Sequence, residues 1–355
     1  MVNIREYRKG DEEGIVSLFN QIYDTSRKED YWKWQFMDNP SGDPIIVVAE
    51  EDSKIIGQCT LLPTEKIIEG KEVLAGDSID TMILKEYRGK GIYEEMAKKS
   101  YEIGAEKGIK IRTGFPTKEA LRGLLGDIGG IFVTDIPLFI NIYKMDNFLV
   151  GIVKINFLAK LLAVPSLLIS KFVYKEQKLK IKENYQIGEI NEFGIEFDKL
   201  WDKIKVDSPI MTKRSSEFLN WRIKNHPSID YKTFGAYLNN ELVGYIILKT
   251  EKRKVRKNVD LTIGNIIDMV GINEDIITAL YFKAKSYFKS IKTDFVVSWA
   301  SETMQYRSLL VKLGFYKTKG GLPFVVKDVG VEKDLEEYIS DEKNWYLMPI
   351  ESDIY

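Results

Sequence analysis

The chain has 355 residues, of which 44% are hydrophobic and 12% aromatic, so it has enough apolar side chains for folded cores. Its 52 lysine and arginine residues nearly balance 53 aspartate and glutamate residues, which argues against a polycation that binds nucleic acid through bulk charge. One cysteine, Cys59, excludes an internal disulfide and a cysteine-rich zinc site, and one histidine, His226, excludes a poly-histidine metal centre. The charged first residues contain no apolar signal core, so we expect a cytoplasmic protein. From the cysteine and histidine counts, we expect no bound metal.

The first third of the chain predicts an alternation of strands and helices. Apolar residues between Ile15 and Tyr23 recur at helical spacing, and Ser53-Lys54 is placed where a hairpin turn belongs. The helix predicted after the strand at 77–84 ends near Gly108. The expected strands lie at 2–7, 45–50, 55–62, 77–84 and 110–115, with a short helix at 118–125 and a last strand after it. This order predicts a mixed sheet covered by helices, a fold of the α/β (α+β mixed sheet) class.

The same pattern occurs twice in the chain. Trp34 in DYWKWQFMDNP corresponds to Trp221 in EFLNWRIKNHP, and Gly57 corresponds to Gly244 at the same offset of 187 residues. Two copies of one unit of roughly 150 residues explain the length better than two unrelated domains do. Below, these are called the first copy and the second copy.

The repeat predicts a first domain at 1–147, a helical connector at 148–183 and a second domain at 184–355. Residues 148–174 are strongly apolar, but lysines and a proline interrupt them, and no uncharged run reaches the roughly 18–20 residues that a membrane-spanning helix needs. Because this segment has no acidic residue, peripheral contact with an anionic membrane is one interpretation. The other is an amphipathic helical pair that packs on the protein.

The stretch most informative about chemistry is the turn Arg88-Gly89-Lys90-Gly91, between a predicted strand and a predicted helix. Glycines allow a tight turn and a close approach of the backbone to a ligand. The first amides of a helix have free N–H groups and lie at the positive end of the helix dipole, so they favour phosphate. The spacing is neither that of a P-loop nor that of a dinucleotide-binding fingerprint. An ordinary strand-to-helix turn is the alternative interpretation.

The strand, this turn and the helix after it resemble the acyl-CoA pyrophosphate loop of GNAT-type N-acyltransferases, R/Q-x-x-G-x-G/A. Arg88 and Gly91 fit the motif, whereas Tyr93 stands where glycine or alanine is usual. The order of elements also resembles the GNAT fold, so the resemblance implies tandem GNAT-like units. It further implies that backbone amides of the turn hold the diphosphate and that the strand before it pairs with pantetheine. The binding residues implied are Met82, Ile83, Leu84, Arg88, Gly89, Lys90, Gly91, Ile92 and Tyr93.

The second copy lacks this motif. The residues aligned with the turn are approximately 273–277, which contain no glycine and have two carboxylates, Glu274 and Asp275, where a diphosphate would lie. Like charges at that distance repel strongly in a cleft of low dielectric. We therefore expect the second copy not to bind CoA, but to cover the site, bind the acceptor or stabilise the first copy.

Two carboxylates are candidates for the base that takes a proton from the acceptor amine. Asp77 and Asp80 lie on the strand before the turn, where the resemblance implies a carboxylate that acts directly or through water. Strand alternation predicts that they point to opposite faces. Asp268 repeats Asp80 in the second copy, which favours Asp77 slightly. The alternative for each is a solvated carboxylate at a strand end.

These features together predict an N-acyltransferase that moves an acyl group, acetyl first among the candidates, from acyl-CoA to a primary amine of a small molecule. A Fem-like aminoacyl-tRNA-dependent transferase is a second interpretation, which the basic run at 251–258 favours slightly. A third is a CoA-binding sensor or interaction module without turnover, because the chain has few candidates for proton transfer. No pattern for sequence-specific nucleic-acid recognition accompanies the basic run.

Overall fold

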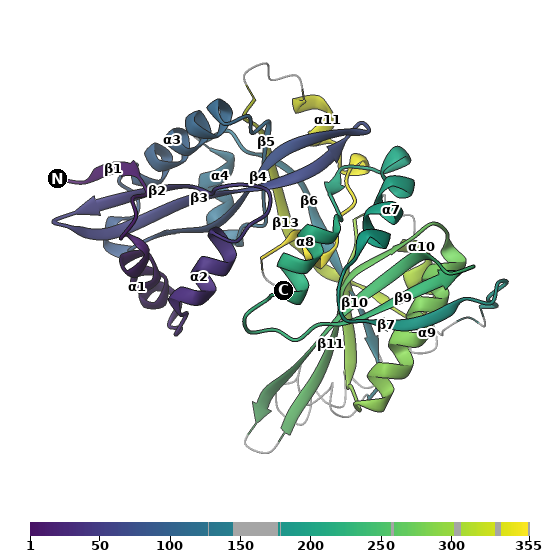
Figure 1. Cartoon of the computed structure of the whole chain (residues 1–355). Coiled ribbons are helices and arrows are strands. Elements are labelled where there is room, and N and C mark those ends of the chain that lie inside the picture. The colour runs from purple at the N-terminus through teal and green to yellow at the C-terminus, as the bar shows by residue number, and fades with distance from the viewer. Residues whose placement is uncertain are drawn as a thin grey trace. The chain divides into compact units, whose positions relative to one another are not determined.

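The computed structural model describes residues 1–126, 128–144, 177, 179–256, 259–301, 307–330 and 335–353 (Figure 1). The apolar segment 148–174, and with it most of the predicted connector 148–183, lies outside the described residues. Within the described residues, no helix is both long enough and apolar enough to cross a bilayer.

The chain forms two compact units, and each is assembled from separate stretches of sequence. The first unit contains Met1–Asp135, Ser208–Ser228 and Leu322–Trp345. The second unit contains Ile136–Asp207, Ile229–Gly321 and Tyr346–Tyr355. Segments are therefore exchanged between the two halves of the sequence, and the linear division at 1–147 and 184–355 stays a prediction.

The sheet of the first unit has the order β1-β2-β3-β4-β5-β13. Neighbouring strands are antiparallel except β4 and β5, which are parallel. The short β8 adds to the far end of β3 by pairing Thr212 with Lys66. The strands of this unit are β1 (Asn3–Glu6), β2 (Ile45–Glu51), β3 (Lys54–Ile68), β4 (Lys71–Ile83), β5 (Ile111–Gly114), β8 (Met211–Thr212) and β13 (Tyr316–Asp328), of which β13 begins in the second unit.

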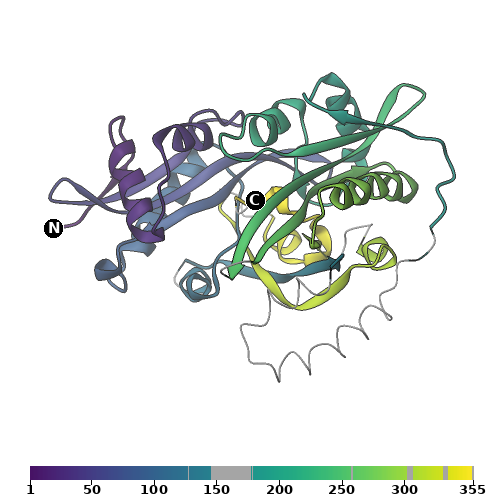
Figure 2. The ribbon, with the colours of Figure 1, turned by 90° about the horizontal axis from the view of Figure 1, so that it is seen from below.

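Helices cover both faces of this sheet. Figure 1 shows α1 (Glu12–Tyr23) and α2 (Glu29–Phe36) on one face and α3 (Ile92–Glu106) on the other, and α1 and α2 come to the front in Figure 2. The α3 face is that of Gly57, Cys59 and Leu61 of β3, since Cys59 Sγ lies 3.7 Å from the hydroxyl of Ser100 and Cβ atoms built at Gly57 and at Gly104 of α3 would meet Met96 and Leu61. The remaining helices of the unit are α4 (Lys118–Leu125), α8 (Ser216–Leu219), the π-helical turn Asn220–Lys224 and α11 (Glu336–Ser340).

The second unit repeats the arrangement, with the sheet order β7-β9-β10-β11-β12-β6. Its parallel pair, β11 and β12, is joined through three residue pairs, as is the pair β4 and β5. The strands are β7 (Gln186–Ile190), β9 (Lys232–Leu238), β10 (Glu241–Arg256), β11 (Val259–Gly271), β12 (Phe295–Trp299) and β6 (Ile131–Ile142), which begins in the first unit. The α-helices that the structure describes in this unit are α7 (Ile195–Ile204), α9 (Glu274–Ser290) and α10 (Arg307–Lys312).

The hairpin strands are longer than the sequence predicts. The first turn lies at Asp52 and Ser53, one residue earlier than expected, and both residues have the left-handed conformation of a two-residue hairpin turn. The next turn is at Glu69 and Gly70, so β3 and β4 extend well beyond the predicted 55–62 and 77–84. In the second copy, Asn239 and Asn240 form the turn that joins β9 to β10.

The repeated tryptophans pack against each other in the first unit. Trp34 Nε1 donates to the carbonyl oxygen of Trp221 at 3.0 Å, and Trp221 Nε1 donates to that of Trp34 at 2.8 Å. The two rings are stacked, with centroids 5.6 Å apart and planes inclined by 25°. A residue of the second copy thus completes the core of the first unit.

Candidate acyl-CoA site

The segment between β4 and α3 is a loop of eight residues, Leu84–Gly91, which begins with a 3-10 turn at Lys85–Tyr87. Gly89 and Gly91 have φ angles of 74° and 76°, a region that L-residues rarely adopt. A Cβ atom built at either glycine would meet no heavy atom of the described residues within 4 Å, apart from chain neighbours. The backbone at both glycines can therefore approach a ligand directly.

Gly91 is the N-cap of α3 and has no side chain that could accept from the first helical amides. The first helical hydrogen bond runs from Glu95 N to Gly91 O at 3.1 Å, so the amides of Ile92, Tyr93 and Glu94 have no partner within the helix. These N–H groups point out of the positive end of the helix dipole. The arrangement fits the predicted diphosphate cradle.

The side chains of the predicted motif turn in different directions. Arg88 Nε donates to the carbonyl oxygen of Ile83 at 3.1 Å and so folds back onto the end of β4. Lys90 Nζ lies 5.0 Å from the centre of the Tyr87 ring. The Tyr93 ring lies near α4, where a Cβ at Gly123 would be 3.8 Å from its edge. The bulky residue in the motif therefore packs on a neighbouring helix.

β4 continues past its pairing with β5. The two strands are in register only over Ala75–Asp77 and Ile111–Thr113, whereas β4 runs on to Ile83. A β-bulge against Gln58 and Thr60 interrupts β4, and Asp80 within it has a φ of 47°. The predicted pantetheine-binding residues, Met82 to Leu84, lie beyond this bulge, where no pairing with β5 occurs in the described part of the chain.

Asp77 is surrounded by donors. Thr113 Oγ1 donates to its Oδ1, Thr64 Oγ1 donates to its Oδ2 at 2.9 Å, and Lys66 Nζ lies 3.2 Å from Oδ1. Lys66 is only 2% exposed and also donates to Thr212 Oγ1 at 2.8 Å. The Asp77 side chain keeps 17% of its surface exposed, so it is accessible from solvent.

Asp80 forms a buried ion pair with Arg27, and its side chain is 5% exposed. The Arg27 guanidinium also lies over the Phe19 ring of α1, 3.4 Å from its centroid. Burial raises the pKa of Asp80, while the charge of Arg27 opposes the shift. Such a pair ties the bulge of β4 to α1.

The two carboxylates share a face, contrary to the expectation from strand alternation. Asp77 lies with Thr64, on the face opposite α3, and Asp80 reaches Arg27 beside α1 on that same face. The reason is the bulge, which adds one residue to β4 between Ile79 and Met82 and breaks the period of two.

The corresponding position in the second unit differs in length and in capping. Only Ile272 and Asn273 separate β11 from α9. The Asn273 side chain caps α9 by accepting from Ile276 N at 3.0 Å. Asp275 accepts from the backbone amides of Lys182 and Glu183, at 3.0 and 3.3 Å. Side chains and backbone of the chain itself therefore occupy the start of α9.

The segment 346–352 lies along β11. Tyr346 Oη donates to the carbonyl oxygen of Met269 at 2.7 Å, and Leu347 N donates to Ser301 Oγ at 3.1 Å. Leu347 and Ile350 are buried. The segment 346–352 thus connects β11 to the residues after β12, beyond their three paired residues. In the first unit, the corresponding place lies between β4 and β5, beyond their paired residues, and it is where we predict that pantetheine binds.

Comparison with known proteins agrees with this description. Residues 3–126 match the family model described as an acetyltransferase (GNAT) domain. The chain is similar to a solved GCN5-related N-acetyltransferase from Anabaena variabilis ATCC 29413, with 14% identity, a TM-score of 0.66, and coverage of 95% of this chain and 75% of that chain. It is also similar to a probable N-acyltransferase from Enterococcus faecalis V583, with 11% identity, a TM-score of 0.63 and coverage of 95% and 75%.

A third similar structure is Saccharomyces cerevisiae N-myristoyltransferase with bound myristoyl-CoA and inhibitors. Its identity is 12%, its TM-score is 0.60, and the match covers 92% of this chain and 80% of that chain. The search of curated proteins found no match. Residues 3–126 therefore match the GNAT domain family, which confirms the resemblance for that part of the chain. The predicted mixed α/β fold with two GNAT-like units is confirmed as well.

Proposed function

We propose that this chain is an acyl-CoA-dependent N-acyltransferase that acylates a primary amine of a small molecule. The observation that carries the proposal is the uncapped start of α3 beside two glycines with positive φ. Amides of Ile92 to Glu94 would bind the diphosphate, and the end of β4 would align the pantetheine arm. Bound acyl-CoA supplies the activated acyl group, with acetyl as the reference donor.

Asp77 is our candidate for the group that accepts the proton of the amine. A carboxylate offers about four acceptor positions, and Thr64, Thr113 and Lys66 use three of them. The remaining position can face an amine or a water molecule. Asp80 is the poorer candidate because its side chain is only 5% exposed, against 17% for Asp77, so a substrate amine reaches it less easily.

The proposal is tested by replacing Gly91 with aspartate. The carboxylate and the Cβ would enter the cradle and repel a diphosphate, so acetyl-CoA affinity should fall at least a hundredfold in isothermal titration. Gly70→Asp is the matched control, because Gly70 has a φ of 74° and equally open surroundings but lies in the β3–β4 turn. Equal affinities of the two variants for acetyl-CoA would refute the assignment of the cradle.

A CoA-binding module without turnover is a second candidate, and one observation favours it: both predicted bases are paired with a cation. A panel of primary amines distinguishes the two functions. Release of free CoA thiol above the hydrolysis rate supports the transferase, whereas tight binding of acetyl-CoA without release for any amine supports the module.

A further inference from the structure

The first unit contains a buried cation that neither the fold nor the proposed reaction explains. Arg112 on β5 is 2% exposed. Its Nε and Nη1 atoms are buried and have no hydrogen-bond partner among the residues that the structure describes. A guanidinium remains charged in proteins, and a buried donor without an acceptor is strongly unfavourable. Arg112 thus has unused capacity to bind an anion.

The guanidinium lies where β4 and β5 separate. Arg112 pairs with Gly76 in the β4–β5 register, and its side chain runs toward Gly114. A Cβ built at Gly114 would be 2.9 Å from an Nη atom of Arg112 and 3.4 Å from Ser78 Cβ. The guanidinium therefore lies beside Ser78, just past the last paired residues of the two strands.

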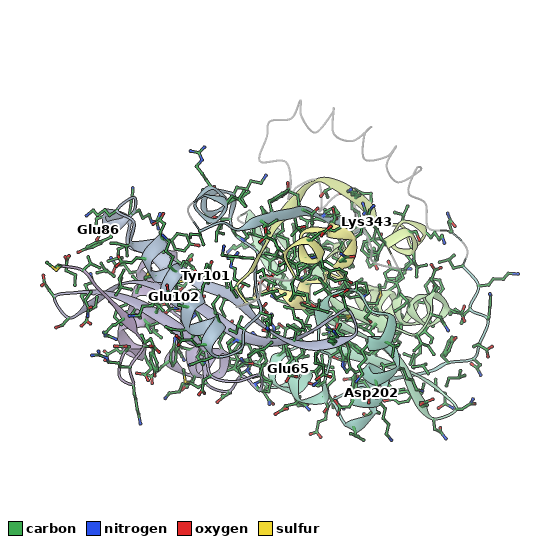
Figure 3. The ribbon with its side chains drawn as sticks, turned by 90° about the horizontal axis from the view of Figure 1, so that it is seen from above. Glu65, Glu86, Tyr101, Glu102, Asp202 and Lys343 are labelled. Carbon is green, nitrogen blue, oxygen red and sulfur yellow. The ribbon has the colours of Figure 1, made fainter. Side chains whose placement is uncertain are left out.

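The groups around this position are polar but uncharged. Ser78 Oγ lies 3.4 Å from Thr81 Oγ1, which in turn donates to the Cys59 thiol at 3.9 Å. Tyr101, labelled in Figure 3, and Tyr93 both belong to α3, and the charge of Arg112 acts on the pKa of each. Burial raises the pKa of Tyr101 to about 12 and also raises the pKa of the Cys59 thiol, so both are neutral at pH 7.

The nearby carboxylates do not neutralise Arg112. Asp77 contacts Lys66 and Asp80 contacts Arg27, and both carboxylates lie on the face opposite α3. Arg112 lies on the α3 face with Ser78 and Thr81. The sheet therefore separates the Arg112 guanidinium from the carboxylates of Asp77 and Asp80.

We propose that Arg112 binds a carboxylate at the end of the acyl group, so that the preferred donor is the CoA thioester of a dicarboxylic acid. This inference rests on the proposed function. Strands rise roughly 3.3 Å per residue, so Ser78 lies about 20 Å along β4 from Leu84. Leu84 begins the loop that leads to the diphosphate cradle, so Ser78 lies on the side of Leu84 away from the cradle. An acyl group delivered along β4 ends at Arg112. A charge-assisted, bidentate hydrogen bond from Nη2 together with Nε or Nη1 would satisfy one of the two buried donors.

Matched pairs of thioesters test this proposal. Succinyl-CoA and butyryl-CoA have four acyl carbons each, malonyl-CoA and propionyl-CoA have three, and only the first member of each pair has a carboxylate. In isothermal titration the protein should bind the acidic member of at least one pair tenfold or more tightly. Arg112→Met should abolish this preference and change butyryl-CoA affinity less than threefold, and Arg112→Lys should retain part of it.

Three outcomes would overturn the assignment. Equal affinities within both pairs would do so, as would a preference that survives Arg112→Met. Thermal unfolding gives the third: Arg112→Met should leave Tm unchanged or raise it, because it removes a buried unpaired charge. A fall of several degrees would show that Arg112 serves the fold. Absence of binding by every thioester and by CoA itself would instead refute the proposed function.

Discussion

Asp77 and Asp80 lie three positions apart on β4, and their neighbours give them different roles. Asp77 is partly exposed and accepts from two hydroxyl groups beside Lys66. Asp80 is buried with Arg27, which in turn packs on Phe19. The first arrangement suits a group that exchanges protons with a substrate, and the second suits a group that holds the bulge of β4.

Asp77→Asn is expected to slow acyl transfer. An amide cannot accept the proton of the amine, so turnover with the best amine of a panel should fall about a hundredfold or more. Affinity for acetyl-CoA should change less than threefold, because Asp77 lies away from the cradle. The rate of CoA thiol release and isothermal titration measure the two effects. Unaltered turnover would remove Asp77 from the reaction.

Asp80→Asn is expected to act on stability. It leaves the Arg27 guanidinium without its carboxylate, so the free energy of unfolding should fall by about 3–5 kcal/mol. Urea unfolding measures this change, and Arg27→Met in the same background should recover part of the loss, since both charges are then absent. A fall below about 1 kcal/mol would contradict the importance of this pair.

At the scale of elements, the sequence predicts the order of strands and helices but misses where the long strands end. Thr64 and Lys66 have polar side chains that indicate a loop after 62, yet both are buried because Asp77 and Thr212 satisfy them. The sequence contains no signal that Arg112 is buried, because a charged residue in a short strand is normally exposed. Tertiary contacts that sequence periodicity does not contain decide these positions.

The turn at 88–91 was predictable because its conformation requires particular residues. Glycines with positive φ stand at positions 89 and 91, and few other residues tolerate that conformation. The absence of such glycines in the second copy predicted a different loop, and the structure has only Ile272 and Asn273 there. The role of 346–352 along β11 was not predictable, since nothing in that segment resembles a ligand.

Leu347→Ala tests the packing of this segment. Leu347 is buried, so the variant should lose about 2–5 kcal/mol of unfolding free energy, measured with urea. Binding of acetyl-CoA should be unaffected, because the short, capped start of α9 still offers no cradle in the second unit. A second molecule of acetyl-CoA bound per chain in this variant would show that 346–352 alone blocks the second unit.

At the scale of the whole molecule, the sequence predicts two copies of one unit, but it does not predict the exchange of segments between them. Aligning the copies treats each as one contiguous domain. In the structure, 208–228 and 322–345 belong to the first unit. Trp221 there bonds with Trp34, and β13 pairs with β5. A one-dimensional alignment has no information about which copy a strand joins.

The exchange predicts that residues 1–147 do not fold alone. Without β13 one edge of β5 is unpaired, and without Trp221 the Trp34 indole loses its hydrogen bonds and its stacking partner. The fragment should show no cooperative thermal transition in circular dichroism and no binding of acetyl-CoA. Cooperative unfolding with retained binding would establish 1–147 as an independent domain.

The central claim is that the start of α3 forms a diphosphate cradle and that the start of α9 does not. Isothermal titration of the full chain with acetyl-CoA tests it most directly through the stoichiometry. The structure predicts one molecule bound per chain. Two molecules per chain, or none at millimolar ligand, would contradict the claim.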